Sequence, residues 1–197
     1  MQLCFATNNA HKLREVTLLL PPAIELVSLA QIGCHEELPE TQETIEGNSR
    51  QKAAYVWEHF GVNCFADDTG LEVSALGGEP GVYSARYAGP QRDNQANIDL
   101  LLGNLAPHPD RKAHFKTVLT LVWEEQFTTF EGLVTGQILF ERRGTGGFGY
   151  DAVFLPDGHN RTFAEMSTEE KGQLSHRGRA LAKLVAFLRE RVVGSGS

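Results

Sequence analysis

The sequence predicts an α/β fold, because short apolar runs typical of strands alternate with segments of helical periodicity. Residues 2–6 (QLCFA) form the first such run, and a helical pattern begins at about Ala10. A later run, 62–66 (VNCFA), ends directly before two adjacent carboxylates, Asp67 and Asp68. Carboxylates at the end of a buried strand occupy the place where an open α/β sheet usually carries its chemistry. We therefore expect this stretch to form the centre of the functional site.

The first half of the chain contains two predicted helices and a second predicted strand. Apolar residues recur at helical spacing after Ala10, and residues 24–29 read as the second strand. Thr44 is expected to cap a helix that runs to Phe60, with Gly61 as its terminator.

The second half predicts more helices and an antiparallel pair of strands. Asp93 can cap a helix, and residues 112–124 and 128–140 alternate like paired antiparallel strands. Residues 152–155 read as a further strand. Ser175 is expected to cap the last helix.

Composition and charge narrow the function classes. The chain has 197 residues and a formal net charge of −7, which disfavours broad nucleic-acid binding. No apolar run approaches the roughly 18 residues needed to span a bilayer, and no signal peptide is visible, so we expect a cytoplasmic protein without a membrane partner. Three cysteines, Cys4, Cys34 and Cys64, suggest buried free thiols. We expect one domain of two lobes over residues 1–193 and a flexible tail at 194–197.

A strand, a polar turn and a helix follow one another at the N-terminus. Thr7, Asn8 and Asn9 lead into the helix, and Lys12 lies in its first turn. Free N–H groups and the helix dipole favour an anion at such a position, so this segment is a candidate phosphate cradle. The alternative is an ordinary N-cap followed by a solvated lysine.

The segment 144–151 (GTGGFGYD) contains four glycines, which allow the backbone to approach a ligand closely. Phe148 and Tyr150 offer flat faces on which a base could stack, and Asp151 could accept a hydrogen bond from the ligand. The alternative is a glycine-rich turn that leads into the next strand.

His176 and Arg177 lie in the first turn of the last helix, where cations are electrostatically misplaced. Their position suggests that they meet something electronegative. The alternative is a pair of exposed polar residues on an early turn.

Together these motifs carry a family resemblance. The segments ATNNAHK, LPET, ADDTGLEVSALGGEPGVYSARYAG, GTGGFGYD and KGQLSHRGRAL occur in this order. The chain resembles the inosine triphosphate pyrophosphatase family (HAM1-like, or XTP/dITP pyrophosphatases) from Leu3 to about Leu188. The resemblance implies an elongated, twisted mixed sheet flanked by helices, with the active site in a cleft between two lobes. It also implies a Mg²⁺-dependent homodimer that hydrolyses ITP, dITP and XTP to the monophosphate and pyrophosphate.

The resemblance also implies roles for individual residues. Asp68 matches the proton acceptor and metal ligand, and Glu40 matches the metal-binding glutamate. The implied substrate-binding residues are Thr7, Asn8, Asn9, Ala10, His11, Lys12, Lys52, Thr69, Phe148, Gly149, Tyr150, Asp151, Lys171, His176 and Arg177. Two positions depart from the family pattern, because Asn8 replaces a common glycine and Thr69 a common serine.

Several choices stay open. Either Asp67 or Asp68 could accept the proton from the attacking water. Donors from His176 and Arg177 would satisfy the O6 acceptor of inosine and xanthosine but oppose an amino group there. The alternatives to this enzyme are a house-cleaning pyrophosphatase for other modified nucleotides, a nucleotide sensor without turnover and, disfavoured by charge, a nucleic-acid-binding protein.

Overall fold

A computed structural model describes residues 1–194 of the chain. The strands are β1 (Gln2–Phe5), β2 (Glu25–Val27), β3 (Cys64–Val73), β4 (Pro80–Gly81), β5 (Lys112–Trp123), β6 (Gln126–Ile138) and β7 (Phe154–Pro156). The α-helices are α1 (Ala10–Leu19), α2 (Ile45–Phe60), α3 (Asn94–Leu105), α4 (Thr168–Leu174) and α5 (His176–Gly194). Of the predicted tail, Gly194 is the last residue of α5, and 195–197 lie outside the described residues.

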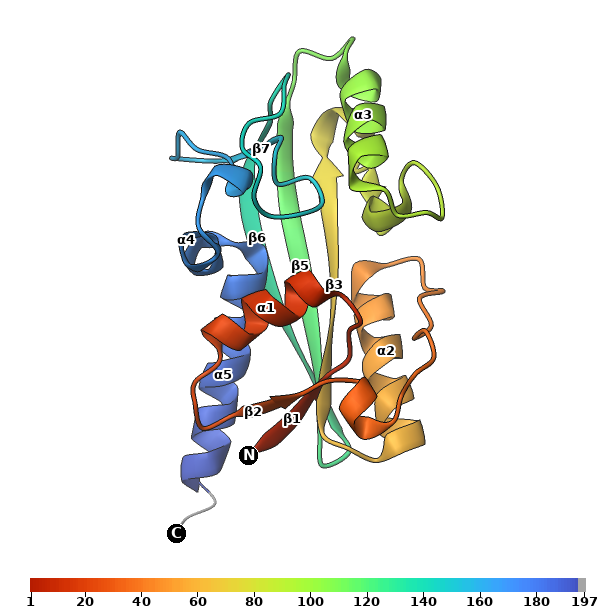
Figure 1. Ribbon diagram of the computed structural model, residues 1–197, viewed down its shortest axis with the longest axis vertical. Coiled ribbons are helices and arrows are strands. Elements are labelled where there is room, and N and C mark those ends of the chain that lie inside the picture. Colours follow the sequence, from red (N-terminus) through yellow and green to blue (C-terminus); the bar gives the residue numbers. More distant parts are fainter. Residues whose placement is uncertain (195–197) are drawn as a thin grey trace. The chain divides into compact units, whose positions relative to one another are not determined.

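The strands form one mixed sheet in the order β2-β1-β3-β5-β6-β7, with β4 paired to β3. β1 is parallel to both β2 and β3, whereas β3 with β4 and β6 with β7 are antiparallel. The predicted α/β fold, a mixed sheet flanked by helices, is confirmed (Figure 1).

The chain divides into two compact units. Of the described residues, the first unit comprises 1–68, 117–132 and 177–194, and the second comprises 69–116 and 133–176. The three long strands β3, β5 and β6 therefore each pass from one unit to the other along the chain. The predicted cleft between two lobes stays a prediction.

The first unit has helices on both faces of its strands. The side chains of β1 contribute alternately to two different cores, because successive side chains of a strand point to opposite faces of the sheet. Leu3 and Phe5 pack with residues of α1 and α5, and Cys4 packs with residues of α2. Figure 1 shows α2 on one face of these strands and α1 and α5 on the other.

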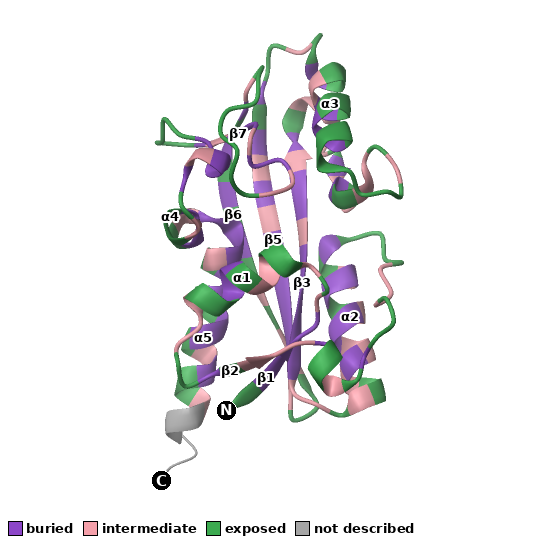
Figure 2. Cartoon of the chain, in the orientation of Figure 1, coloured by how far each residue is buried: buried purple, intermediate pink, exposed green. Residues whose placement is uncertain are grey.

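The second unit is built around one apolar core. α3 contributes Ile98, Leu101 and Leu105 to it, and the aromatic rings of Phe115 and Phe154 meet edge to face with centroids 4.6 Å apart. In Figure 2, α3 alternates between buried and exposed residues along its length, as expected for a helix with one face in the core.

Local signals set the helix ends as predicted. The Thr44 side chain accepts a hydrogen bond from the Gly47 N–H at the start of α2, and Gly61 ends that helix in the left-handed conformation. Asp93 accepts from the Ala96 N–H at the start of α3.

Strand boundaries differ from the prediction in several places. The strand predicted at 24–29 spans only Glu25–Val27, and the last one is shifted to Phe154–Pro156. β6 begins at Gln126 rather than 128, because Glu124 and Glu125 both adopt positive φ and close a two-residue turn. Positive φ is uncommon for residues other than glycine, so the local sequence does not predict this tight turn.

Asp67 and Asp68 lie in the middle of a strand. They were expected at the end of a strand, and that expectation is wrong, because β3 continues to Val73. It is the parallel neighbour β1 that ends here, at Phe5, which pairs with Phe65.

Among residues 1–194, none of the helices is long and apolar enough to cross a membrane. The three cysteines are buried and free, as predicted. Burial raises the pKa of the Cys4 and Cys64 thiols to about 12, so these thiols stay protonated near neutral pH.

Candidate active site

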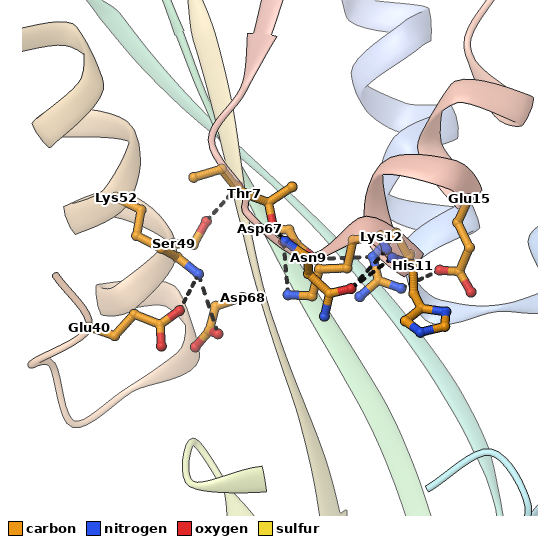
Figure 3. A network of polar contacts seen from close by, with 12 residues as sticks. Thr7, Asn9, His11, Lys12, Glu15, Glu40, Ser49, Lys52, Asp67 and Asp68 are labelled. Atoms are coloured by element: carbon orange, nitrogen blue, oxygen red, sulfur yellow. Dashed lines mark hydrogen bonds and ion pairs between the residues drawn. The ribbon is translucent and has the colours of Figure 1, made fainter. Parts of the chain in front are cut away.

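In the first unit, Asp67 is held between two cations from different helices. Its Oδ1 lies 3.0 Å from Lys12 Nζ on α1, and its Oδ2 lies 3.0 Å from Arg177 Nε on α5 (Figure 3). Burial alone would raise the pKa of this fully buried carboxyl, but Lys12 and Arg177 outweigh burial and hold the pKa well below its usual range. Asp67 is therefore a firmly ionised anchor for both helices.

Arg177 has a second carboxylate partner. Its Nη1 lies 2.5 Å from Glu15 Oε2, one turn further along α1 from Lys12. Both residues are buried, and Arg177 is only 1% exposed. Glu15, Arg177, Asp67 and Lys12 thus form a continuous chain of buried ion pairs in alternating sign.

Asp68 belongs to a second group, around Lys52 of α2. Lys52 Nζ lies 2.7 Å from Glu40 Oε1 and 3.8 Å from Asp68 Oδ1 (Figure 3). Burial raises the pKa of Asp68, although Lys52 and Lys12 oppose this. The other oxygen, Asp68 Oδ2, is buried and has no hydrogen-bond partner among the described residues. A buried carboxylate oxygen without a donor is expected to bind a ligand that the chain itself does not supply.

A divalent cation fits this group. Glu40 and Asp68 offer carboxylate oxygens on either side of Lys52. Within the described residues, no cluster of three or more His, Cys, Asp or Glu side chains could hold a metal. Mg²⁺ is typically held by one or two carboxylates and takes its remaining oxygens from water and from substrate phosphates. The site matches that pattern better than a closed, all-protein metal cage.

The candidate phosphate cradle is present but partly satisfied by its own side chains. Asn9 Oδ1 accepts from the His11 and Lys12 amides, at 3.0 and 3.2 Å, and Thr7 Oγ1 accepts from the Asn9 amide at 3.1 Å. Asn9 is thus an N-cap, as the alternative predicted. The solvated lysine of that alternative is wrong, because Lys12 is paired with Asp67. Asn8, Ala10 and His11 are exposed.

A second cluster lies in the other unit, around Asp151. Its Oδ2 accepts from Lys171 Nζ at 2.7 Å and from the Phe148 amide at 3.0 Å. Lys171 Nζ also lies 4.5 Å from the centroid of the Phe148 ring, a cation–π arrangement. Gly147 has a positive φ, and a Cβ there would overlap Asp151 Oδ2, so this close approach requires glycine.

The aromatic residues of the glycine-rich segment have different surroundings. Tyr150 is buried and donates to the Ser84 carbonyl at 2.7 Å, which makes it a core residue of the second unit. Phe148 is partly exposed and is the ring of this segment that a base could reach. Gly149 separates them in the left-handed conformation.

His176 and Arg177 contact different clusters although they are neighbours in sequence. The His176 ring stacks on Phe115 of the second unit, with centroids 4.6 Å apart. Arg177 does meet electronegative groups, as predicted, but these are the carboxylates of the first unit. Both side chains are buried, so the alternative of two exposed polar residues is wrong.

The structure thus groups the predicted residues in two sets. The first unit brings together Thr7, Asn9, Lys12, Glu40, Lys52, Asp68 and Arg177 with Asp67, and it also contains the exposed residues Asn8, Ala10 and His11. The second unit contains Thr69, Phe148, Gly149, Tyr150, Asp151, Lys171 and His176. Glu15 was not predicted as a site residue from the sequence. The available hint is its acidic side chain, which lies one helical turn from Lys12 and beside the apolar Val16.

Comparison with known proteins decides the family. The sequence profile of the Ham1 family matches residues 3–187. The chain belongs to the Ham1 family. The resemblance read from the sequence motifs is therefore confirmed.

Individual Ham1 relatives are similar over almost their whole length. The dITP/XTP pyrophosphatase of Flavobacterium psychrophilum is 50% identical over 189 residues, which cover 96% of this chain and 100% of that protein. The dITP/XTP pyrophosphatase of Porphyromonas gingivalis is 52% identical over 189 residues, with coverage of 95% and 97%. The Ham1 protein of Staphylococcus aureus has the same fold, with a TM-score of 0.88, 36% identity and coverage of 97% and 100%.

Asp67→Asn should destabilise the protein strongly, because it leaves Lys12 without its paired carboxylate and removes one of the two buried carboxylates that pair with Arg177. Breaking such a pair from one side typically costs about 3–5 kcal/mol, which urea denaturation would measure. The folded-state pKa of Asp67 is depressed, so its contribution is complete above the ordinary aspartate pKa and declines as acid protonates the carboxylate. The difference from wild type should therefore shrink at strongly acid pH.

The exposed Asp157→Asn variant is the matched control, since it removes a carboxylate from the surface. Equal stability losses in the two variants at neutral pH would contradict the anchoring role of Asp67.

Proposed function

We propose that this chain hydrolyses the deaminated purine nucleoside triphosphates ITP, dITP and XTP to the nucleoside monophosphate and pyrophosphate. The proposal depends on the buried Oδ2 of Asp68, which lies beside the Lys52–Glu40 pair and accepts no hydrogen bond within the described part of the chain. The names of the Flavobacterium and Porphyromonas relatives, both dITP/XTP pyrophosphatases, support the substrate class.

Of the two neighbouring aspartates, Asp68 is the better candidate for the proton acceptor and metal ligand. Both oxygens of Asp67 are engaged by cations, and its pKa is depressed, so it would hold a proton poorly. Asp68 has a raised pKa, and its Oδ2 accepts no hydrogen bond from any of the residues that the structure describes. A base whose pKa is raised toward the working pH is more effective in general base catalysis.

Mg²⁺ is the proposed cofactor, held by Asp68 and Glu40. When bound, it would neutralise charge on the phosphates and orient their oxygens. The charge balance of the first unit favours such a requirement. Three buried or half-buried cations (Lys12, Lys52 and Arg177) face four carboxylates (Glu15, Glu40, Asp67 and Asp68). Among these seven side chains the carboxylates outnumber the cations by one, so a bound divalent cation would favour the approach of a triphosphate.

The roles of the two lysines follow from their positions. Lys52 lies between Glu40 and Asp68, where it can contact a phosphate oxygen and stabilise the departing pyrophosphate. Lys12, at the first turn of α1, can do the same from the phosphate cradle. Both side chains are held in advance by carboxylates, which reduces the rearrangement needed when substrate binds.

Base selection is proposed for the second unit's cluster. The Phe148 ring offers a stacking face, and the Lys171 ammonium and His176 can supply donors for the O6 acceptor of a 6-oxopurine. An adenine would present an amino donor to these groups instead. A mismatch of this kind in a buried site can reach on the order of 10⁴-fold discrimination.

The proposed activity is tested by pyrophosphate release from ITP, XTP, GTP and ATP at equal concentration, first with Mg²⁺ and then with EDTA. We expect rapid release from ITP and XTP that EDTA abolishes. Equal rates on all four nucleotides would contradict the base-selection role of the second unit. Binding without release would favour the sensor alternative, and a preference for modified pyrimidine triphosphates would favour the house-cleaning alternative.

Asp68→Asn should retain the fold and lose nearly all hydrolysis, since it removes the proton acceptor and one metal ligand while keeping the side chain's shape. Circular dichroism and steady-state pyrophosphate release would measure the two properties separately. Near wild-type turnover in this variant would move the proton acceptor elsewhere, with Asp67 the next candidate.

We also propose a cytoplasmic homodimer, an assembly expected from the family resemblance. Light scattering coupled to gel filtration should give twice the chain mass of 21.7 kDa. A single species at the monomer mass would contradict the dimer.

A further inference from the structure

Two residues in the first two turns of α2, Asn48 and Ser49, contact the segments that carry the proposed metal ligands. On one side, the Asn48 Oδ1 accepts a hydrogen bond from the Gln42 amide at 2.9 Å, and Asn48 is only 2% exposed. Gln42 lies two residues after Glu40, so this bond fixes the loop that carries the carboxylate.

The same loop is held at two further points. The Gln51 side chain bonds both the amide and the hydroxyl of Thr41, at 2.9 and 2.8 Å. The loop also lies close against the helix, because a Cβ at Gly47 would be 2.8 Å from Gln42 Cβ. The two residues that follow Glu40 are thus both attached to α2.

On the other side, Ser49 ties α2 to strand β3. Its hydroxyl lies 3.0 Å from the Ala66 carbonyl oxygen and 2.9 Å from Thr120 Oγ1, and the residue is fully buried. Ala66 lies two residues before Asp68 and on the same face of the strand. Figure 3 shows Ser49 and Lys52 projecting from α2, with the Lys52 ammonium directed toward Glu40 and Asp68.

We infer that Asn48 and Ser49 are positioning residues that set the separation of Glu40 and Asp68 and so prearrange the two carboxylates for a divalent cation. The inference rests on the proposed function, in which these carboxylates bind Mg²⁺. Fixing a loop residue on binding costs conformational entropy, and hydrogen bonds already made in the free protein remove that cost from the binding step.

A purely structural role for the two residues has a different consequence. If they only dock α2, then any change that loosens the start of the helix should weaken metal binding equally. Thr44→Ala provides that comparison, because it removes the N-cap of the same helix, whose side chain bonds the Gly47 amide, without removing a bond to Gln42 or Ala66.

The test uses the full chain and four variants: Asn48→Ala, Ser49→Ala, Gln51→Ala and Thr44→Ala. Mn²⁺ binding is titrated by electron paramagnetic resonance in the presence of an α,β-methylene analogue of inosine triphosphate, which cannot be cleaved. The Mg²⁺ concentration for half-maximal pyrophosphate release and the urea midpoint are measured on the same samples. Gln51 is only half-buried, so its variant remains informative even if a core variant fails to fold.

We expect Asn48→Ala and Ser49→Ala to weaken Mn²⁺ binding roughly 10-fold or more, with a smaller effect in Gln51→Ala. Their Mg²⁺ requirement should rise in parallel, and release at saturating Mg²⁺ should fall less. Thr44→Ala should shift the urea midpoint while Mn²⁺ affinity stays at the wild-type value.

Two results from the variants would overturn the inference: wild-type Mn²⁺ affinity in Asn48→Ala, Ser49→Ala and Gln51→Ala, or an equal loss of affinity in Thr44→Ala. A wild-type protein that does not bind Mn²⁺ overturns it as well. A wild-type protein that binds Mn²⁺ but releases no pyrophosphate contradicts the proposed function instead, and the variants' Mn²⁺ affinities then decide the inference on their own.

Discussion

The buried carboxylate of Asp67 is the interaction on which the first unit depends. It accepts one cation from α1 and another from α5, and it lies on the strand that runs through the middle of the unit. Removing such charges from water is expensive, and the expense is offset only when each carboxylate oxygen finds a donor of good geometry. Asp67 meets that condition at both oxygens, and Glu15 compensates the remaining charge of Arg177. The start of each helix is thereby fixed to the sheet next to the proposed phosphate site.

The different roles of Asp67 and Asp68 follow from the pleat of β3. Successive residues of a strand face opposite ways, so Phe65 and Asp67 face α1 and α5, whereas Ala66 and Asp68 face α2. Asp67 therefore meets two fixed cations. Asp68 faces the polar end of α2 and shares one lysine with Glu40. Adjacent residues of one type thus acquire opposite pKa shifts from the two sides of a single sheet.

Local rules predicted much of the fold from sequence, and non-local contacts limited the rest. Thr44, Gly61 and Asp93 carry their signals within a few residues, and the structure confirms the helix ends that they predict. The extent of β3 was not predictable in the same way, because Asp67 reads as the end of a strand unless the cations that neutralise it are known. Arg177 shows the same limit: its misplacement at a helix start indicated an electronegative partner, but Asp67 is 110 residues away in sequence.

The buried face of α2 shows where a sequence signal for the positioning residues was available. Its buried positions are Ile45, Asn48, Ser49, Lys52, Ala53 and Val56, which follow helical spacing along one side. The stripe is polar in its middle and apolar toward its C-terminal end. An asparagine, a serine and a lysine in a buried stripe lose hydrophobic stabilisation and must each find a partner. Here the partners are the Gln42 amide, the Ala66 carbonyl and the Glu40 carboxylate. Glu40 is itself a proposed metal ligand, and Gln42 and Ala66 each lie two residues from one. Polar residues that interrupt a buried helical stripe therefore mark the end of the helix that faces the site, whereas the apolar remainder of the stripe marks the part that only packs.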